Sequence, residues 1–169
     1  MAIVTLAFRR ADLARLPRGS GFLVPAVDGR TIKAATFTSG KWDWAAAADP
    51  GLFLLRASIG RHGEEGPLGW DDADLVRAAL DDLGEAAGLS AGPVGSEVTR
   101  WLGALPQYTV GHHARVTRIR SYLSGLPGLA LCGAAYDGVG IPACIAGATQ
   151  AVAELLRTLP TGPREEAGE

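Results

Sequence analysis

The stretch L-A-L-C-G-A-A-Y-D-G-V-G-I-P-A-C-I, from Leu129 to Ile145, is the most informative part of this 169-residue sequence. Residues 129–133 are predicted to form a short buried strand, and the glycine-rich residues 134–140 a turn. Pro142 stands near the first position of a helix predicted over residues 141–159, where its missing N–H costs nothing. The stretch therefore predicts a strand, a turn and a helix in succession.

The glycines of this turn limit what the unit can bind. Residues 138–143, G-V-G-I-P-A, fit the pattern G-x-G-x-x-A of a dinucleotide-binding turn. That interpretation fails, because no second strand with an acidic residue follows about twenty positions on to bind a ribose. Small residues before a helix N-terminus still suit a phosphate or the electron-rich edge of a reduced flavin. The structural alternative is a plain glycine-rich connection that closes a sheet.

The residues before this unit predict an antiparallel sheet with one helix. Short turns separate the apolar, β-rich runs, and an Asp28-Gly29 hairpin signal stands between two of them. Strands are expected over residues 2–9, 19–25, 31–39, 52–60 and 94–101. One helical turn is expected within residues 11–18, an irregular segment over 41–51, and helices over 71–88 and 112–125, the first with Leu75, Ala79, Leu83 and Ala86 on its apolar face. The predicted fold class is α+β.

Composition excludes several classes of protein. Lys plus Arg number 16 and Asp plus Glu 18, so the charge balance is wrong for nucleic-acid binding. No apolar run is long enough to span a membrane. Two cysteines, Cys132 and Cys144, make no disulfide framework, and a reduced cytoplasmic protein is expected. The adjacent His112 and His113 point about 100° apart on a helix, so no metal site is expected.

Five blocks in one order carry a resemblance to a known family. G-F-L-V-P starts at Gly21, F-T-S-G-K-W at Phe37 and L-R-A-S-I-G-R at Leu55. W-L-G-A-L-P-Q-Y-T-V-G-H starts at Trp101, and P-G-L-A-L-C-G-A-A-Y-D-G-V-G-I-P-A-C-I at Pro127. Together they resemble the C-terminal part of the oxygen-dependent protoporphyrinogen and coproporphyrinogen oxidases, amine-oxidase-like flavoproteins, in their actinobacterial form.

The resemblance implies a function and a division of the chain. It implies FAD as cofactor, coproporphyrinogen III as substrate, dioxygen as acceptor and hydrogen peroxide as product, in haem biosynthesis. Residues 1–105 would belong to a substrate-binding domain and 106–159 to the C-terminal part of an FAD-binding domain, with 160–169 a disordered tail. Because the cofactor performs the difficult step, no catalytic side chain is assigned. The implied cofactor contacts are Gly133, Ala134, Gly138, Val139, Gly140 and Ile141, and the implied substrate wall includes Leu23 and Phe37.

The sequence departs from this family at its start. The family's first strand and its G-x-G-x-x-G turn for the FAD pyrophosphate are not in these residues. The 169-residue polypeptide alone is therefore expected to bind FAD weakly or not at all. A partner chain with the N-terminal half, or a homo-oligomer, could complete it. The alternatives are an inert or partner-dependent truncated protein, a protoporphyrinogen IX oxidase, and another amine-oxidase-like flavoprotein.

Overall fold

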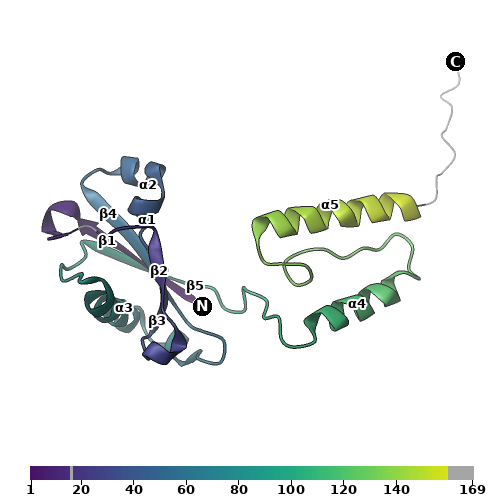
Figure 1. Cartoon of the computed structure of the whole chain (residues 1–169), viewed down its shortest axis with the longest axis horizontal. Coiled ribbons are helices and arrows are strands. Elements are labelled where there is room, and N and C mark those ends of the chain that lie inside the picture. The colour runs from purple at the N-terminus through teal and green to yellow at the C-terminus, as the bar shows by residue number, and fades with distance from the viewer. Residues whose placement is uncertain (16, 160–169) are drawn as a thin grey trace, which may run out of the picture. The chain divides into compact units, whose positions relative to one another are not determined.

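The chain folds into two compact units, which divide between Ala104 and Leu105 (Figure 1). The computed structural model describes residues 1–15 and 17–159. The tail predicted over 160–169 lies outside the described residues.

A five-stranded antiparallel sheet forms the centre of the first unit (Figure 1). The strands lie in the order β2-β3-β4-β1-β5, and β1 and β4 pair over their whole length, from Ala2 opposite Ile59 to Arg9 opposite Leu52. The antiparallel sheet expected from the sequence is confirmed. The strands are β1 (Ala2–Arg9), β2 (Gly21–Leu23), β3 (Ile32–Thr36), β4 (Leu52–Ile59) and β5 (Gly95–Arg100).

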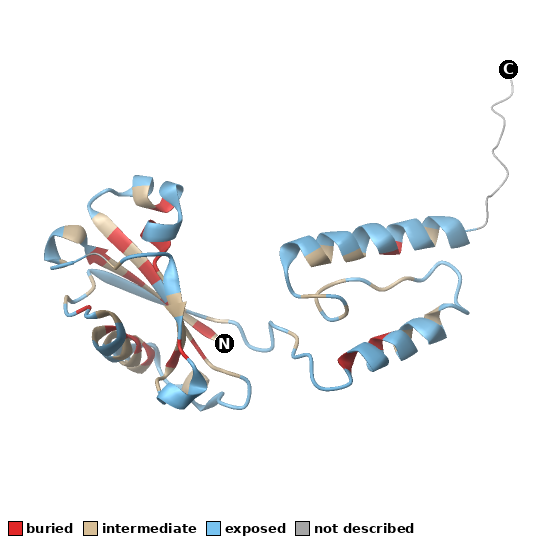
Figure 2. Cartoon of the chain, viewed as in Figure 1, coloured by how far each residue is buried: buried red, intermediate tan, exposed pale blue. Residues whose placement is uncertain are grey.

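Helix α3 (Asp72–Ala87) packs against one face of this sheet (Figure 2). The Asp71 carboxylate accepts the backbone N–H of Asp74 at the start of the helix, and Gly88 ends it with a φ of 68°. Its buried side chains share one apolar core with alternate residues of β1 and β4, as the helical spacing predicted; Ala86, expected with them, is exposed. The fully buried members include Val4, Leu6, Phe8, Leu55, Ile59, Leu75, Ala79 and Leu83.

Two short helices occur where the sequence predicted a strand and an irregular segment. Helix α1 (Thr38–Lys41) occupies the end of the strand predicted over 31–39. There the Ser39 hydroxyl accepts the backbone N–H of Leu54, a bond that a longer β3 would otherwise supply. Helix α2 (Asp43–Ala48) lies in the segment predicted as irregular, because a run of alanines has high helix propensity. The expected turn within 11–18 is instead a 3₁₀ turn at Arg10–Asp12.

The second unit consists of α4 (His112–Leu123) and α5 (Ile141–Thr158), as predicted, joined by an irregular segment. The strand predicted over 129–133 is wrong. Residues 105–159 contain no strand, so an extended segment there has no partner for its backbone groups. The buried side chains described in this unit are His112, Val116 and Ala151.

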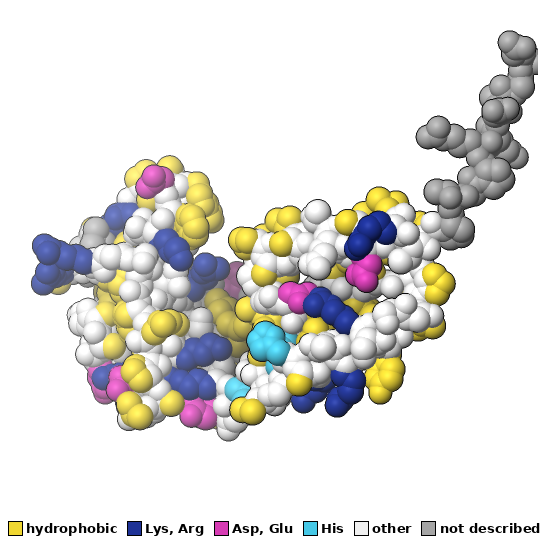
Figure 3. All heavy atoms as spheres, turned by 45° about the vertical axis from the view of Figure 1, so that its right-hand side comes forward, with side chains coloured by type: hydrophobic (Ala, Val, Ile, Leu, Met, Phe, Trp, Pro, Cys, Tyr) yellow, Lys and Arg dark blue, Asp and Glu magenta, His cyan; other side chains and the backbone are white. Residues whose placement is uncertain are grey.

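Helix α5 carries a stripe of apolar side chains on its exposed side. Ile141 is 77% exposed, Ile145 63%, Val152 54% and Leu156 69%. Their spacing places them within about a sixth of a turn around the helix axis. Figure 3 shows hydrophobic side chains at the surface of both units. In the described parts of the chain, no helix combines the length and apolar character needed to cross a bilayer.

Replacing Leu83 with Ala should lower the free energy of unfolding of the first unit by about 2–5 kcal/mol, because it leaves a cavity in the core. The four tryptophans, Trp42, Trp44, Trp70 and Trp101, all belong to this unit. Tryptophan fluorescence during urea unfolding therefore reports this unit alone. Leu80→Ala, at a partly buried position of the same helix, is the control and should cost less.

Candidate functional site

The six residues implied as cofactor contacts lie within residues 133–141: five in the turn over 133–140, and Ile141 as the first residue of α5. Gly133 has a φ of 114° and Gly138 a φ of 142°, values that favour glycine. A Cβ at Gly138 would stand 2.8 Å from the Cβ of Ala143, whereas a Cβ at Gly133 would meet nothing within 4 Å. Gly138 is therefore required by packing, and Gly133 leaves open space beside the backbone.

The N-terminus of α5 opens from this turn. Gly140 is the N-cap residue, and no side chain caps the helix there. The first-turn N–H groups of an 18-residue helix give a partial positive charge at this end. Val139 is 51% exposed and Ile141 77% exposed on either side of the cap. The site thus combines an apolar surface with backbone donors, which suits a flat ring that has an electron-rich edge.

Four side chains bond to the turn, from α4, from α5 and from the segment that precedes α4. The Tyr108 hydroxyl donates to the carbonyl of Ala134, and the Nε2 atom of His112 lies 3.1 Å from the carbonyl of Tyr136. Arg120 Nη2 donates to Asp137 Oδ2 at 2.6 Å, and this bond raises the pKa of Arg120 above its usual value. The Cys144 thiol donates weakly to Gly138.

The sequence predicted none of these anchoring contacts. Tyr108 and His112 stand four residues apart, and the turn follows more than twenty residues later. A separation of that size predicts no contact by itself. The Sγ atom of Cys144 lies 3.5 Å from the Gly138 carbonyl oxygen.

The two residues implied as substrate wall lie on opposite faces of the sheet. The ring of Phe37 packs 5.9 Å from that of Phe22, on the face covered by α3, and Phe37 is 4% exposed. Leu23 follows Phe22 in β2, so its side chain points to the other face; it is 83% exposed. The structure does not bring these two side chains together.

The uncovered face of the sheet also carries Arg56. In the β-ladders Leu23 stands opposite Ala34, and Thr36 opposite Arg56, which places these side chains on one face. Arg56 is exposed.

Arg61, unlike the exposed Arg56, binds backbone carbonyls of its own unit. Its guanidinium donates to the carbonyls of Val24, Arg30 and Ile32 at 2.8–3.0 Å. Burial lowers the pKa of Lys33, and the charge of Arg61 lowers it further. These contacts fix the end of the sheet where β2 and β3 meet.

Metal ligands do not cluster in the described residues. No group of three His, Cys, Asp or Glu side chains there could hold a metal ion. The carboxylates of Asp71 and Asp72 serve the start of α3, where Asp71 caps the helix and Asp72 pairs with Arg100 at 2.5 Å.

Several known proteins are similar to this chain. A relative from Bacillus subtilis (strain 168), named coproporphyrinogen III oxidase, is 36% identical over 160 residues, 94% of this chain and 34% of that protein. A relative of the same name from Mycobacterium tuberculosis (strain H37Rv) is 38% identical over 143 residues, 85% of this chain and 30% of that protein. The chain is related to the coproporphyrinogen III oxidases. It spans about a third of the length of these curated relatives.

A solved structure and the family models complete this comparison. The structure, titled as a putative protoporphyrinogen oxidase from Exiguobacterium sp. 255-15, matches with a TM-score of 0.76 and 36% identity. The match covers 92% of this chain and 34% of that one. No family model matches the chain. The predicted resemblance to the porphyrinogen oxidases is confirmed.

The same substitution should destabilise α5 at one glycine of the turn and have little effect at another. Gly138→Ala should destabilise the start of α5 by about 1–3 kcal/mol, since its φ is 142° and the new Cβ meets Ala143. Gly140→Ala is the matched control, because Gly140 has a φ of −73° and its Cβ would lie 3.8 Å from Pro142. Hydrogen exchange of the α5 amides measures both. Equal effects would contradict the geometry of the turn.

Proposed function

We propose that this chain is part of an FAD-dependent coproporphyrinogen III oxidase of haem biosynthesis, and that it supplies the flavin-ring end of the cofactor site. The observation that carries the proposal is the uncapped N-terminus of α5, which opens from a glycine turn between the exposed Val139 and Ile141. The relatives named coproporphyrinogen III oxidase support the choice of reaction.

The residues of the turn would hold the flavin through backbone and apolar contacts. Gly133 and Ala134 would let the ring approach the backbone closely, because they carry little or no side chain, and Gly138 would keep the turn in shape beside them. Val139, Gly140 and Ile141 would contact its edge, with the α5 dipole favouring negative charge there. When bound, the flavin would accept the hydride equivalents removed from the porphyrinogen and pass them to dioxygen, which yields hydrogen peroxide.

The substrate would contact the sheet of the first unit on its uncovered face. Leu23 offers exposed apolar surface to the tetrapyrrole, and Arg56 on the same face offers a guanidinium to a propionate carboxylate. Phe37 would act through the core on the opposite face, where its packing against Phe22 supports β2. Leu23 and Arg56 therefore form the part of the substrate wall that this chain contributes directly.

The second candidate function is oxidation of a related substrate, protoporphyrinogen IX. A relative from Bos taurus that is named protoporphyrinogen oxidase is 31% identical over 166 residues. Protoporphyrinogen IX has two propionates where coproporphyrinogen III has four, so the two substrates differ in the number of carboxylates that arginines would bind.

We propose the cytoplasm as location, since free Cys132 and Cys144 suit a reducing compartment.

The 169-residue polypeptide alone should recognise the flavin ring and little else. We expect it to bind riboflavin, FMN and FAD weakly, with dissociation constants within about threefold, because contacts to the ring are common to all three. Equilibrium dialysis measures the three constants. FAD that binds a hundred times more tightly than riboflavin, or that copurifies stoichiometrically, would show that these residues also hold the pyrophosphate.

Reconstitution tests the enzymatic proposal directly. The chain is co-expressed with the two thirds of the Bacillus subtilis relative that it does not match, and the relative's own two parts serve as positive control. Flavin absorbance and peroxide production are measured with coproporphyrinogen III and with protoporphyrinogen IX. We expect flavin retention and faster oxidation of coproporphyrinogen III. If the control is active and the hybrid retains no flavin and makes no peroxide, the proposal fails.

A charge at the turn should weaken flavin binding in the reconstituted protein. Val139→Asp places a carboxylate at the proposed ring edge, and we expect at least about tenfold weaker binding. Val152→Asp is the matched control, because Val152 is 54% exposed and Val139 51%, and both changes add one negative charge. Since acids near a helix N-terminus stabilise it, unfolding of α5 would not explain a specific effect at 139. Equal effects would contradict the assigned site.

A further inference from the structure

Tyr108 and His112 make a paired contact with the turn before α5. Their rings stack with centroids 4.0 Å apart and planes 7° from parallel. The Tyr108 hydroxyl donates to the carbonyl of Ala134, and His112 Nε2 lies 3.1 Å from the carbonyl of Tyr136. Because a carbonyl oxygen only accepts, Nε2 carries the proton in this contact. One stacked pair therefore holds two carbonyls of the turn, two residues apart.

The turn needs external support to keep one shape. Gly133, Gly138 and Gly140 give it large conformational freedom, and ordering such residues costs more entropy than ordering any others. One backbone bond within the turn, from the N–H of Tyr136 to the carbonyl of Gly133 at 3.1 Å, joins its residues. The side-chain contacts to Ala134 and Tyr136 come from outside the turn and compensate for this weakness.

Burial distinguishes His112 from an ordinary surface histidine. It is 8% exposed, at the first position of α4, whereas the adjacent His113 is exposed, with its ring centroid 5.8 Å from that of His112 and the two planes inclined by 67°. In the described residues of the second unit, only Val116 and Ala151 are buried besides it. Arg120, further along α4, adds an ion pair with Asp137 of the same turn.

We propose that Tyr108 and His112 are positioning residues for the flavin ring: together they hold residues 133–140 in the conformation that presents Val139 and the α5 N-terminus to the cofactor. The inference rests on the proposed function for its link to flavin. Its structural half, that this pair orders the turn, is independent of any ligand. The two halves can be tested separately.

Backbone order parameters from NMR relaxation test the structural half in the flavin-free, ¹⁵N-labelled 169-residue chain. We expect values near 0.85 for the amides of residues 133–140, and values below about 0.6 in Tyr108→Phe and in His112→Leu. His112→Gln should restore much of the order, because its side-chain amide offers an N–H donor at similar reach. Tyr108→Phe removes one oxygen atom from an exposed residue, so it leaves the fold intact even if His112→Leu does not.

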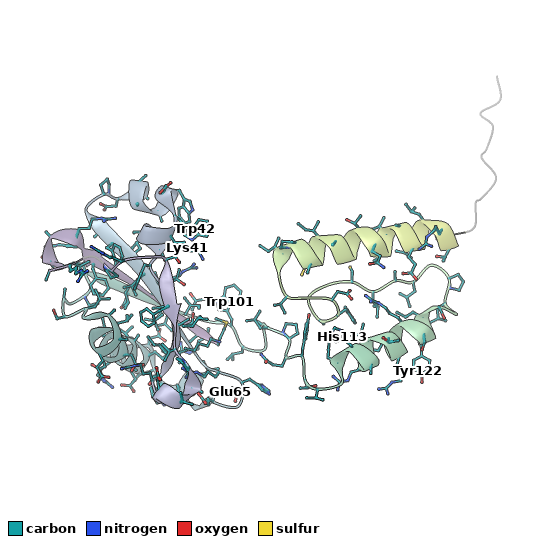
Figure 4. All side chains as sticks on the ribbon, in the orientation of Figure 1. Lys41, Trp42, Glu65, Trp101, His113 and Tyr122 are labelled. Atoms are coloured by element: carbon teal, nitrogen blue, oxygen red, sulfur yellow. The ribbon has the colours of Figure 1, made fainter. Side chains whose placement is uncertain are left out.

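Tyr122→Phe is the matched control for the tyrosine change. Tyr122 lies on α4, 73% exposed (Figure 4), and its loss of a hydroxyl should leave the order parameters of the turn unchanged. Unchanged order parameters in both Tyr108→Phe and His112→Leu would overturn the inference. So would equal loss of order in Tyr122→Phe.

Riboflavin titration of the reconstituted protein tests the link to flavin. We expect Tyr108→Phe to weaken binding about three- to tenfold, with His112→Gln close to the unsubstituted protein. If the turn loses order but flavin binding is not weaker, Tyr108 and His112 order the turn, and the assignment of this turn to the flavin is overturned. Loss of both supports the complete inference.

Discussion

Side-chain hydrogen bonds to the carbonyls of one glycine-rich turn carry the structure of the second unit. His112, Val116 and Ala151 are the buried side chains described there, so apolar packing stabilises it little. The contacts of Tyr108, His112 and Arg120 connect α4 and the segment before it to residues 134–137, and through them to the start of α5. Loss of this connection would leave two helices that share a small interface.

The first unit is stabilised in the opposite way. The pairing of β1 with β4 over eight residues fixes which side chains of the two strands face α3, and those side chains form a continuous apolar core. The uncovered face is a consequence of the same alternation, since every second residue must point away from the core. Leu23 and Arg56 owe their exposure to this register.

Periodicity in the sequence predicted most of the fold, because alternation and helical spacing are local signals. It located β1, β4 and α3 closely, and the capping residues Asp71 and Gly88 marked the ends of the helix. It failed at residues 129–133, where apolar composition suggested a strand but no partner strand is available in the unit. It also failed at α2, where the helix propensity of four successive alanines was not recognised in a segment that also contains glycines and tryptophans.

The candidate site was predictable only in part, for a physical reason. Closely spaced glycines before a helix are visible in the sequence, so the turn at 133–140 could be located. The contacts of Tyr108, His112 and Arg120 that support it join residues 17 to 26 positions apart, and no local pattern encodes them. Likewise, the sequence could not reveal that Leu23 and Phe37 face opposite sides of the sheet, because this depends on the register in which β2 pairs with β3, where Leu23 stands opposite Ala34.

The outward apolar stripe of α5 has a practical consequence. Ile141, Ile145, Val152 and Leu156 present a nonpolar strip to water in the native state. A hydrophobic fluorescent dye would bind this strip as readily as it binds a molten globule. Dye-based melting curves of the isolated polypeptide would therefore begin with a high signal, and circular dichroism is the sounder way to follow its unfolding.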